Sequence, residues 1–197
     1  MLKSIAKILF KYRSYTPIPF LIVMVLFHQA SVWSIIIGFL IALLGESFRL
    51  WGVIYAGSET RTTGDVGGTY LVISGAFGHL RNPLYLGNIL LYLGIGIMSF
   101  ALFPYLQIVA LLFFYFQYRL IINAEEEYLQ KRFGVQYDNY KKSVPRLIPK
   151  IKSFQAAEIS QPPLNFSAGV RSEKRTLQAF ASVTLIILII FAVKNFG

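Results

Sequence analysis

Cysteine is absent from this 197-residue chain and histidine is scarce, and both facts limit the available chemistry. The absence of cysteine excludes disulfides, thiolate nucleophiles and thiolate metal ligands, and it leaves the redox compartment open. His28 and His79 belong to different segments, which argues against a metal site built from several imidazoles. We therefore expect no metal at the functional site.

Charged residues are also few, at 14% of the chain against 55% hydrophobic residues, and the mean hydropathy is +0.57. A soluble domain of this size has too little interior to bury that much apolar surface, so an integral membrane protein is expected. The net charge of +10 would suit nucleic acid. However, the basic residues flank apolar runs, a pattern typical of membrane orientation and of contact with anionic lipid head groups. We expect membrane lipid as a partner and no nucleic acid.

The apolar runs predict an all-α, polytopic membrane bundle of about five transmembrane helices. The expected segments are an amphipathic interfacial segment at 1–16, a four-helix membrane bundle at 17–123 with a polar loop at 57–83, a cytoplasmic segment at 124–150, a linker at 151–176 and a fifth transmembrane helix at 177–194. The first apolar run, residues 18–30, is short for the roughly 20 residues that a crossing requires. Whether it crosses fully is left open.

The distribution of basic residues predicts the orientation. The N-terminal arm, the 57–83 loop and the 124–176 region contain nearly all of them, and an even number of expected spans separates these regions. All three therefore lie on one side, which the positive-inside rule identifies as the cytoplasm. We expect a multi-pass protein of a bacterial or archaeal inner membrane.

Residues 78–87 have the sequence Gly-His-Leu-Arg-Asn-Pro-Leu-Tyr-Leu-Gly, which places polar groups at the mouth of an apolar helix. Pro83 suits the first turn of that helix, and polar groups at such a depth favour a functional site over interfacial anchoring alone. Within the second span, Glu46 and Arg49 are three residues apart. They either pair with each other or face an interior polar cavity.

The cytoplasmic regions bring two sets of candidate functional groups to one face. The first set is His79, Arg81, Asn82 and Tyr85, and the second is Arg119, Glu125 and Glu126. A site at the end of a helical bundle can accept one water-soluble and one lipid-soluble reactant. Its main contribution would be positioning and the exclusion of water.

Two motifs within this region carry a resemblance to a known family. The first comprises Leu71-Val72, Ser74-Gly75, Phe77, Arg81-Asn82-Pro83, Tyr85 and Gly87, and the second comprises Glu125-Glu126, Leu129, Phe133-Gly134, Tyr137, Tyr140, Val144-Pro145 and Ile148-Pro149. Together they resemble the signatures of the isoprenylcysteine carboxyl methyltransferase family, whose broader group includes the phospholipid N-methyltransferases. The resemblance covers roughly residues 45–150.

The resemblance implies a membrane methyltransferase that uses S-adenosyl-L-methionine without a Rossmann sheet. Its C-terminal cytoplasmic helical region, residues 124–150, would bind the cofactor together with the first motif. The implied cofactor-binding residues are Tyr70, Leu71, Val72, Phe77, His79, Asn82, Pro83, Leu84, Tyr85 and Glu125. Glu125 would be the acidic anchor for the amino group or the ribose hydroxyls. The candidate catalytic residues are Arg81, Glu126 and Arg119.

The methyl acceptor is the open question at this stage. Family members that act on isoprenylcysteine commonly have histidine at the position of Asn82, and the arginine expected just before the glutamates is represented only by Arg119. A carboxylate acceptor would be oriented by Arg81 or Arg119, whereas an amine acceptor would need a base such as Glu126 or His79. The motifs favour O-methylation of an isoprenylcysteine-like carboxylate, with N-methylation of a phosphatidylethanolamine-type lipid as the alternative. The acceptor would be a lipophilic small molecule or a lipid-anchored partner.

Two alternatives lie outside methyl transfer. Sterol and enone reductases, which use NADPH, have a similar C-terminal end, although the chain is short for that group. A non-enzymatic membrane scaffold or transporter subunit is the other alternative, but it would not need a polar cluster at one helix mouth. The sequence predicts no oligomeric state.

Overall fold

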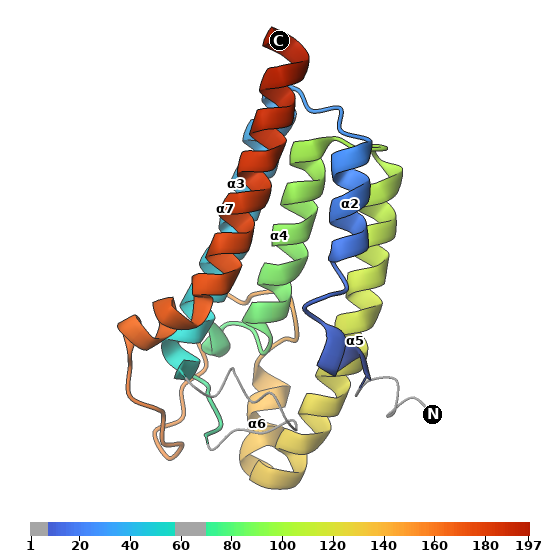
Figure 1. Ribbon diagram of the computed structural model, residues 1–197. Coiled ribbons are helices and arrows are strands. Elements are labelled where there is room, and N and C mark those ends of the chain that lie inside the picture. Colours follow the sequence, from blue (N-terminus) through green and yellow to red (C-terminus); the bar gives the residue numbers. More distant parts are fainter. Residues whose placement is uncertain (1–7, 58–69) are drawn as a thin grey trace.

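The described part of the chain, residues 8–57 and 70–197 of a computed structural model, is built from helices and contains no strand (Figure 1). The helices are α2 (Ile18–Leu26), α3 (Val32–Ala56), the short 3₁₀ helix η2 (Gly75–Gly78), α4 (Pro83–Ser99), α5 (Tyr105–Phe133), α6 (Val135–Ser143) and α7 (Phe166–Phe196). Residues 8–12 are also helical. Parts of the predicted 1–16 segment and of the predicted 57–83 loop lie outside the described residues.

The expected fold class, an all-α membrane bundle, is confirmed. Among the described helices, α3, α5 and α7 are long and apolar enough to cross a membrane. Helix α4 has 17 residues, so it is about 26 Å long and close to the roughly 30 Å of a hydrocarbon core. Helix α2 has only nine residues, about 13 Å, so it does not cross by itself. The first of the five expected spans is therefore a half-length helix.

Two predicted boundaries fall inside helices and are corrected. Helix α5 runs without a break through residue 124 because the chain there is rich in helix formers, and it ends at Gly134, whose φ of 51° suits a residue without a side chain. Helix α7 begins at Phe166, where the side chain of Asn165 accepts a hydrogen bond from the Ala168 amide. The predicted linker therefore ends at residue 165.

Helices α3 and α4 form the closely packed centre of the bundle. A Cβ atom added to Gly45 would lie 2.6 Å from the Gly87 carbonyl oxygen, and one added to Gly94 would lie 2.6 Å from that of Gly38. Only glycine allows the two backbones to approach this closely. The predicted role of Gly87 and Gly94 in helix contact is confirmed, and their partner is α3.

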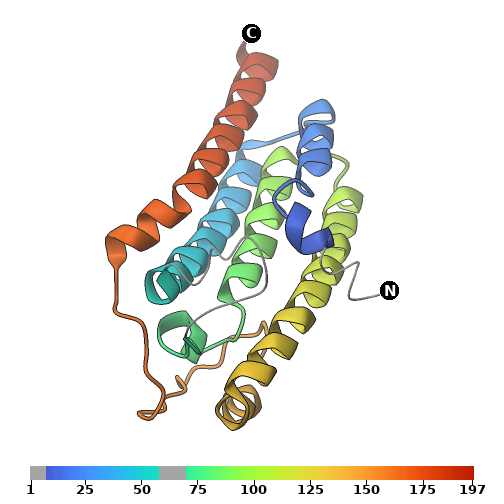
Figure 2. The ribbon, with the colours of Figure 1, turned by 60° about the horizontal axis from the view of Figure 1, so that its bottom comes forward.

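The loops that carry the two motifs gather at one end of the bundle. Figure 1 shows η2 and α6 at this end, opposite the C-terminus of α7. Figure 2 shows the segment after α6 passing beneath η2 before it reaches α7. Segments distant in sequence thus meet below the membrane-crossing helices.

Candidate functional site

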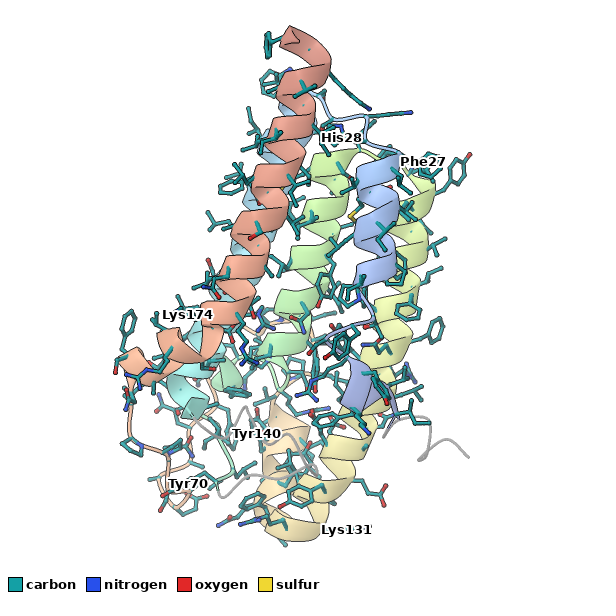
Figure 3. The ribbon with its side chains drawn as sticks, in the orientation of Figure 1. Phe27, His28, Tyr70, Lys131, Tyr140 and Lys174 are labelled. Carbon is teal, nitrogen blue, oxygen red and sulfur yellow. The ribbon has the colours of Figure 1, made fainter. Side chains whose placement is uncertain are left out.

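A cavity of about 720 Å³ lies between the helices and reaches the end of the bundle that holds the two motifs. Tyr70 and Tyr140, which contribute to its lining, are at this end, far from His28 (Figure 3). The predicted site residues that line it are Tyr70, Leu71, Val72, Phe77, Arg81, Asn82, Leu84, Tyr85, Glu125 and Glu126. The two motifs therefore contribute to one cavity.

Three predicted site residues do not line the cavity. Pro83 is buried as the first residue of α4, where its missing amide hydrogen leaves no helical bond unmade. His79 donates from Nδ1 to the Lys150 carbonyl oxygen at 2.9 Å and packs against Trp51, so its ring braces the loop. Arg119 is exposed on α5 and donates to the Tyr115 hydroxyl at 3.0 Å.

The cavity wall formed by residues 70–74 is held by one side chain from the segment before α7. The Gln161 amide oxygen accepts from the Ile73 amide at 2.8 Å and from the Ser74 amide at 3.2 Å. Its amide nitrogen donates to the Leu71 carbonyl oxygen at 3.0 Å. Gln161 thereby satisfies backbone groups that a neighbouring β-strand would otherwise pair with. Nothing in the spacing of the sequence marks this role.

The next part of the same wall is held by α6 and the residues after it. The Tyr140 hydroxyl donates to the Phe77 carbonyl oxygen at 2.8 Å, and the Phe154 amide donates to the Gly78 carbonyl oxygen at 2.8 Å. Burial raises the pKa of Tyr140 and that of Tyr137 well above the usual value for a phenol. Both side chains line the cavity, and both remain hydrogen-bond donors at neutral pH.

A buried ion cluster joins the two motifs. Arg81 Nε donates to Glu126 Oε1 at 3.0 Å, and Arg146 also pairs with this carboxylate through Nη2 and Oε2. Arg81 Nη1 donates to the carbonyl oxygens of Lys141 at 2.8 Å and Val144 at 2.7 Å. The cluster uses both oxygens of Glu126 and most donors of Arg81, so its evident effect is to fix the loop before α4 against α5 and α6.

Glu125 is the carboxylate that the cavity presents to a ligand. Its Oε1 accepts a hydrogen bond of 2.7 Å from the Tyr85 hydroxyl, and the Tyr85 ring packs on Tyr118 at 4.8 Å between centroids. Glu125 lines the cavity together with Arg13, which comes from the N-terminal segment. One acidic and one basic group thus lie beside aromatic and apolar surfaces.

A second charged group of the cavity was only partly predicted. Arg49 Nη2 donates to Glu173 Oε2 at 2.6 Å, whereas Arg49 Nε lies 3.6 Å from Glu46 Oε2. The expected pair of Glu46 and Arg49 therefore has a third and closer member from α7. Arg49 also bonds Asn88 on α4, and it lines the cavity. Glu173 lies in the segment that was predicted to be a linker, so the sequence gave no reason to place it here.

The arrangement suits group transfer between two bound reactants more than hydrolysis or metal chemistry. Residues 8–57 and 70–197 contain no cluster of three or more histidine or carboxylate side chains that could hold a metal ion. The cavity instead combines apolar walls with a few oriented charges. Such a site acts by holding reactants in position and keeping out water.

Comparison with known proteins identifies the family. The family profile described as phospholipid methyltransferase matches residues 33–136. A cobalt-zinc-cadmium resistance protein, CzcN, of Cupriavidus metallidurans is 25% identical over 154 residues, covering 65% of this chain and 67% of that protein. A nickel-cobalt-cadmium resistance protein, NccN, of Alcaligenes xylosoxydans xylosoxydans is 22% identical over 148 residues, covering 66% and 68%. The matched region contains α3, α4 and α5 with the cavity residues that they carry, and the chain belongs to the phospholipid methyltransferase family of membrane proteins.

Proposed function

We propose that the protein transfers a methyl group from S-adenosyl-L-methionine to a lipophilic acceptor within this cavity, at the cytoplasmic face of the membrane. The observation that carries the proposal is the joining of both motifs around one cavity between membrane-crossing helices. Membership of the phospholipid methyltransferase family supports methyl transfer as the reaction type. The basic residues near the cavity end of the bundle, including Lys141, Lys142 and Lys174, support the cytoplasmic orientation.

The lining of the cavity fits the proposed cofactor. Its volume of about 720 Å³ lies within the usual range for small-molecule sites. Glu125 would hold the ammonium group or a ribose hydroxyl, and Arg13 would hold the carboxylate. Phe77 and Tyr137 offer aromatic surface for the adenine. The remaining proposed cofactor contacts are Tyr70, Leu71, Val72, Asn82, Leu84 and Tyr85.

S-adenosyl-L-methionine would supply an electrophilic methyl group, whose bond to sulfur breaks as the acceptor's lone pair attacks, so that sulfur keeps the electron pair. The protein's own contribution is to hold both reactants in line and to exclude water. The tight hydrogen bonds of Gln161 and Tyr140 to the 70–78 wall support such positioning. No side chain of the cavity needs to act as a nucleophile.

The contacts of the candidate catalytic residues favour supporting roles. Arg81 and Glu126 are bound to each other and to Arg146, and we propose that they position the cavity wall. Arg119 faces away from the cavity, so we leave it out of the proposed site. His79 supports the same wall through its bond to Lys150.

The acceptor is either a carboxylate, as in isoprenylcysteine O-methylation, or the amine of a phosphatidylethanolamine-type lipid. The first had been favoured by the motifs, but neither of its proposed orienting arginines, Arg81 and Arg119, points an uncommitted guanidinium into the cavity. The family match favours an amine lipid as the second candidate. The names of the two metal-resistance relatives mention no methyl acceptor.

Calorimetric titration of the detergent-solubilised protein tests the proposal. We expect S-adenosyl-L-methionine and S-adenosylhomocysteine to bind and NADPH not to bind. Glu125→Gln should weaken binding roughly 10-fold or more, since hydrogen bonds to a charged group contribute about 1.5–3 kcal/mol. The matched control is Glu127→Gln, on the same helix but outside the cavity lining, which should bind within about twofold of wild type.

Each contrary result points to a different protein. Binding of NADPH without S-adenosyl-L-methionine would favour the reductase, and binding of neither would favour the scaffold. Equal affinities of wild type and a folded Glu125→Gln variant would remove Glu125 from the proposed cofactor contacts.

A further inference from the structure

Helix α7 contributes a carboxylate to the cavity from outside the region that matches the family profile, which ends at residue 136. Gly169 sets this helix against α3, because a Cβ atom there would lie 2.9 Å from the Ile54 Cα atom. Glu173 is four residues further on and so faces the same side. There its Oε2 accepts from Arg49 Nη2 at 2.6 Å, while the Thr176 hydroxyl accepts from the same nitrogen at 3.2 Å.

The cluster around Arg49 contains more acceptors than donors. Glu46 is 4% exposed, and among the described residues neither of its carboxylate oxygens has a hydrogen-bond partner. The cation nearest to Glu46 is Arg49, whose Nε is 3.6 Å away. Glu173 is 3% exposed and shares the same guanidinium. Two buried carboxylates facing one guanidinium leave a negative charge uncompensated and acceptor oxygens unused, which is costly in a low-dielectric interior.

The cluster lies between a polar and an apolar part of the cavity. Tyr85, Asn88, Tyr92 and Ile95 all line the cavity and follow one face of α4 at spacings of three and four residues. Asn88, which bonds Arg49, is therefore about one helical turn from Tyr85 and its partner Glu125.

Beyond the cluster the lining of the cavity becomes apolar. It includes Ile18 and Leu21 of α2, Ile95 of α4, and Phe180 and Val183 of α7. A hydrocarbon chain fits this part of the cavity by its chemistry. The shape and polarity therefore suit an amphiphile whose head group lies at the level of Asn88.

The depth of the cluster in the membrane agrees with this placement. Residues 176–193 of α7 are 18 residues without a charge, which is about 27 Å of helix and close to the thickness of a hydrocarbon core. Glu173 lies just before this stretch. The cluster is therefore at the depth where a membrane amphiphile changes from head group to chain.

We propose that the acceptor of the methyl group is an amphiphile with a cationic amine head, held by Glu173 and the cluster around Arg49, with its chain between α2 and α7. The inference rests on the proposed function and names the acceptor class for the same cavity. An ammonium group brings three donors and one positive charge to a cluster that lacks both. A carboxylate or phosphate head would add negative charge beside two carboxylates and would be rejected. Arg175, which also lines the cavity, is exposed and does not neutralise the buried pair.

The first test compares three probes of equal chain length, decylamine, decanol and decanoic acid, in non-ionic detergent with the wild-type protein. Calorimetric titration in the presence of S-adenosylhomocysteine should give decylamine an affinity roughly 10-fold or more above both other probes. Equal or tighter binding of decanoic acid would overturn the inference. This comparison requires no variant.

The second test replaces the α7 carboxylate. Glu173→Gln should lower decylamine affinity roughly 10-fold while leaving decanol within about twofold. Glu158→Gln, the same change at an exposed position, should leave both affinities at the wild-type value. An ion pair that only fastens α7 to α3 would instead change the unfolding midpoint and leave probe selectivity intact, and that result would also overturn the inference.

S-adenosylhomocysteine binding separates the two levels of the argument. If the wild-type protein binds it but does not distinguish decylamine from decanol, the amine assignment is wrong and the methyltransferase proposal stands. If the protein binds neither S-adenosylhomocysteine nor S-adenosyl-L-methionine, the proposed function itself is wrong.

Discussion

At the scale of single side chains, one carboxylate shared by two guanidinium groups connects the motifs. Glu126 is bound by Arg81 and Arg146, and its side chain is only 8% exposed. The planar fork of Arg81 reaches this carboxylate and two carbonyl oxygens at once, which a lysine ammonium on its flexible stem does not do. Arginine at this position is therefore required by geometry and not only by charge.

Arg81→Lys should consequently destabilise the protein. The loss of the two bonds to backbone carbonyls, of Lys141 and Val144, should cost about 2 kcal/mol and lower the unfolding midpoint by roughly 4–8 °C. Thermal unfolding in detergent, followed by circular dichroism, measures the shift. Arg119→Lys is the control, because its exposed side chain should give no measurable change. An unchanged midpoint in Arg81→Lys would show that the ion cluster does not hold the loop.

At the scale of elements, the segment between α6 and α7 acts as a strap across the cavity wall. It bonds to residues 71–79 through Gln161, Phe154 and Lys150, and Tyr140 adds a bond from α6 itself. The wall has no regular structure before η2, so its shape depends on these contacts. The strap is thereby part of the site although only Gln161 among its polar side chains has several bonds to the wall.

Removing the Gln161 amide should loosen the wall more than it affects the fold. Gln161→Ala leaves the amides of Ile73 and Ser74 without a partner, and we expect S-adenosyl-L-methionine affinity to fall roughly 5- to 20-fold. Gln161→Glu keeps the acceptor oxygen but loses the bond to Leu71, so its affinity should be intermediate. Calorimetry gives the affinity and thermal unfolding gives the stability of each variant.

The control for this prediction is Gln155→Ala, an exposed glutamine of the same segment, which should behave as wild type. A positioning role predicts partial rescue by Gln161→Glu with little change in the unfolding midpoint. If both Gln161 variants lost affinity only in proportion to lost stability, the residue would be a general structural contact.

The helices could be predicted from local sequence, whereas much of the site could not. Apolar runs and breakers such as Pro83 and Gly134 mark α4 and α5 because these signals act over a few residues. Glu173 and Gln161 act through partners more than 80 residues away, and no spacing rule connects such positions in a single sequence. His79 was misplaced for a related reason. An imidazole at a helix mouth resembles a ligand-binding group until its bond to Lys150 is seen.

At the scale of the whole molecule, the helices separate a loop-rich end from an end with short turns. Residues near Ser143 and Ser153 belong to the first, and residues near Gln29 and Gly197 belong to the second (Figure 1). The cavity opens toward the motifs at the loop-rich end. This separation makes the orientation testable on a chain that contains no cysteine.

Single-cysteine labelling should assign the two ends to opposite sides of the membrane. With a membrane-impermeant maleimide added outside, Gln29→Cys and Gly197→Cys should react, and Ser143→Cys and Ser153→Cys should react only after permeabilisation. Both serines of the second pair are at the loop-rich end, so they should agree with each other. Labelling of Ser143→Cys in intact cells would reverse the proposed orientation and move the site to the outer face.

The unbroken course of α7 links the acceptor cluster to the thickness of the bilayer. The helix is 31 residues long and carries Glu173 at the start of its uncharged stretch, so tilting to match a thinner or thicker membrane also moves this carboxylate. Helices α3 and α4 are fastened by their glycine contacts and should tilt together, which leaves Arg49 and Asn88 in a fixed relation. Hydrophobic mismatch would therefore open or close the pair of Arg49 and Glu173. Lipid chain length then becomes a control on which head groups the cavity accepts.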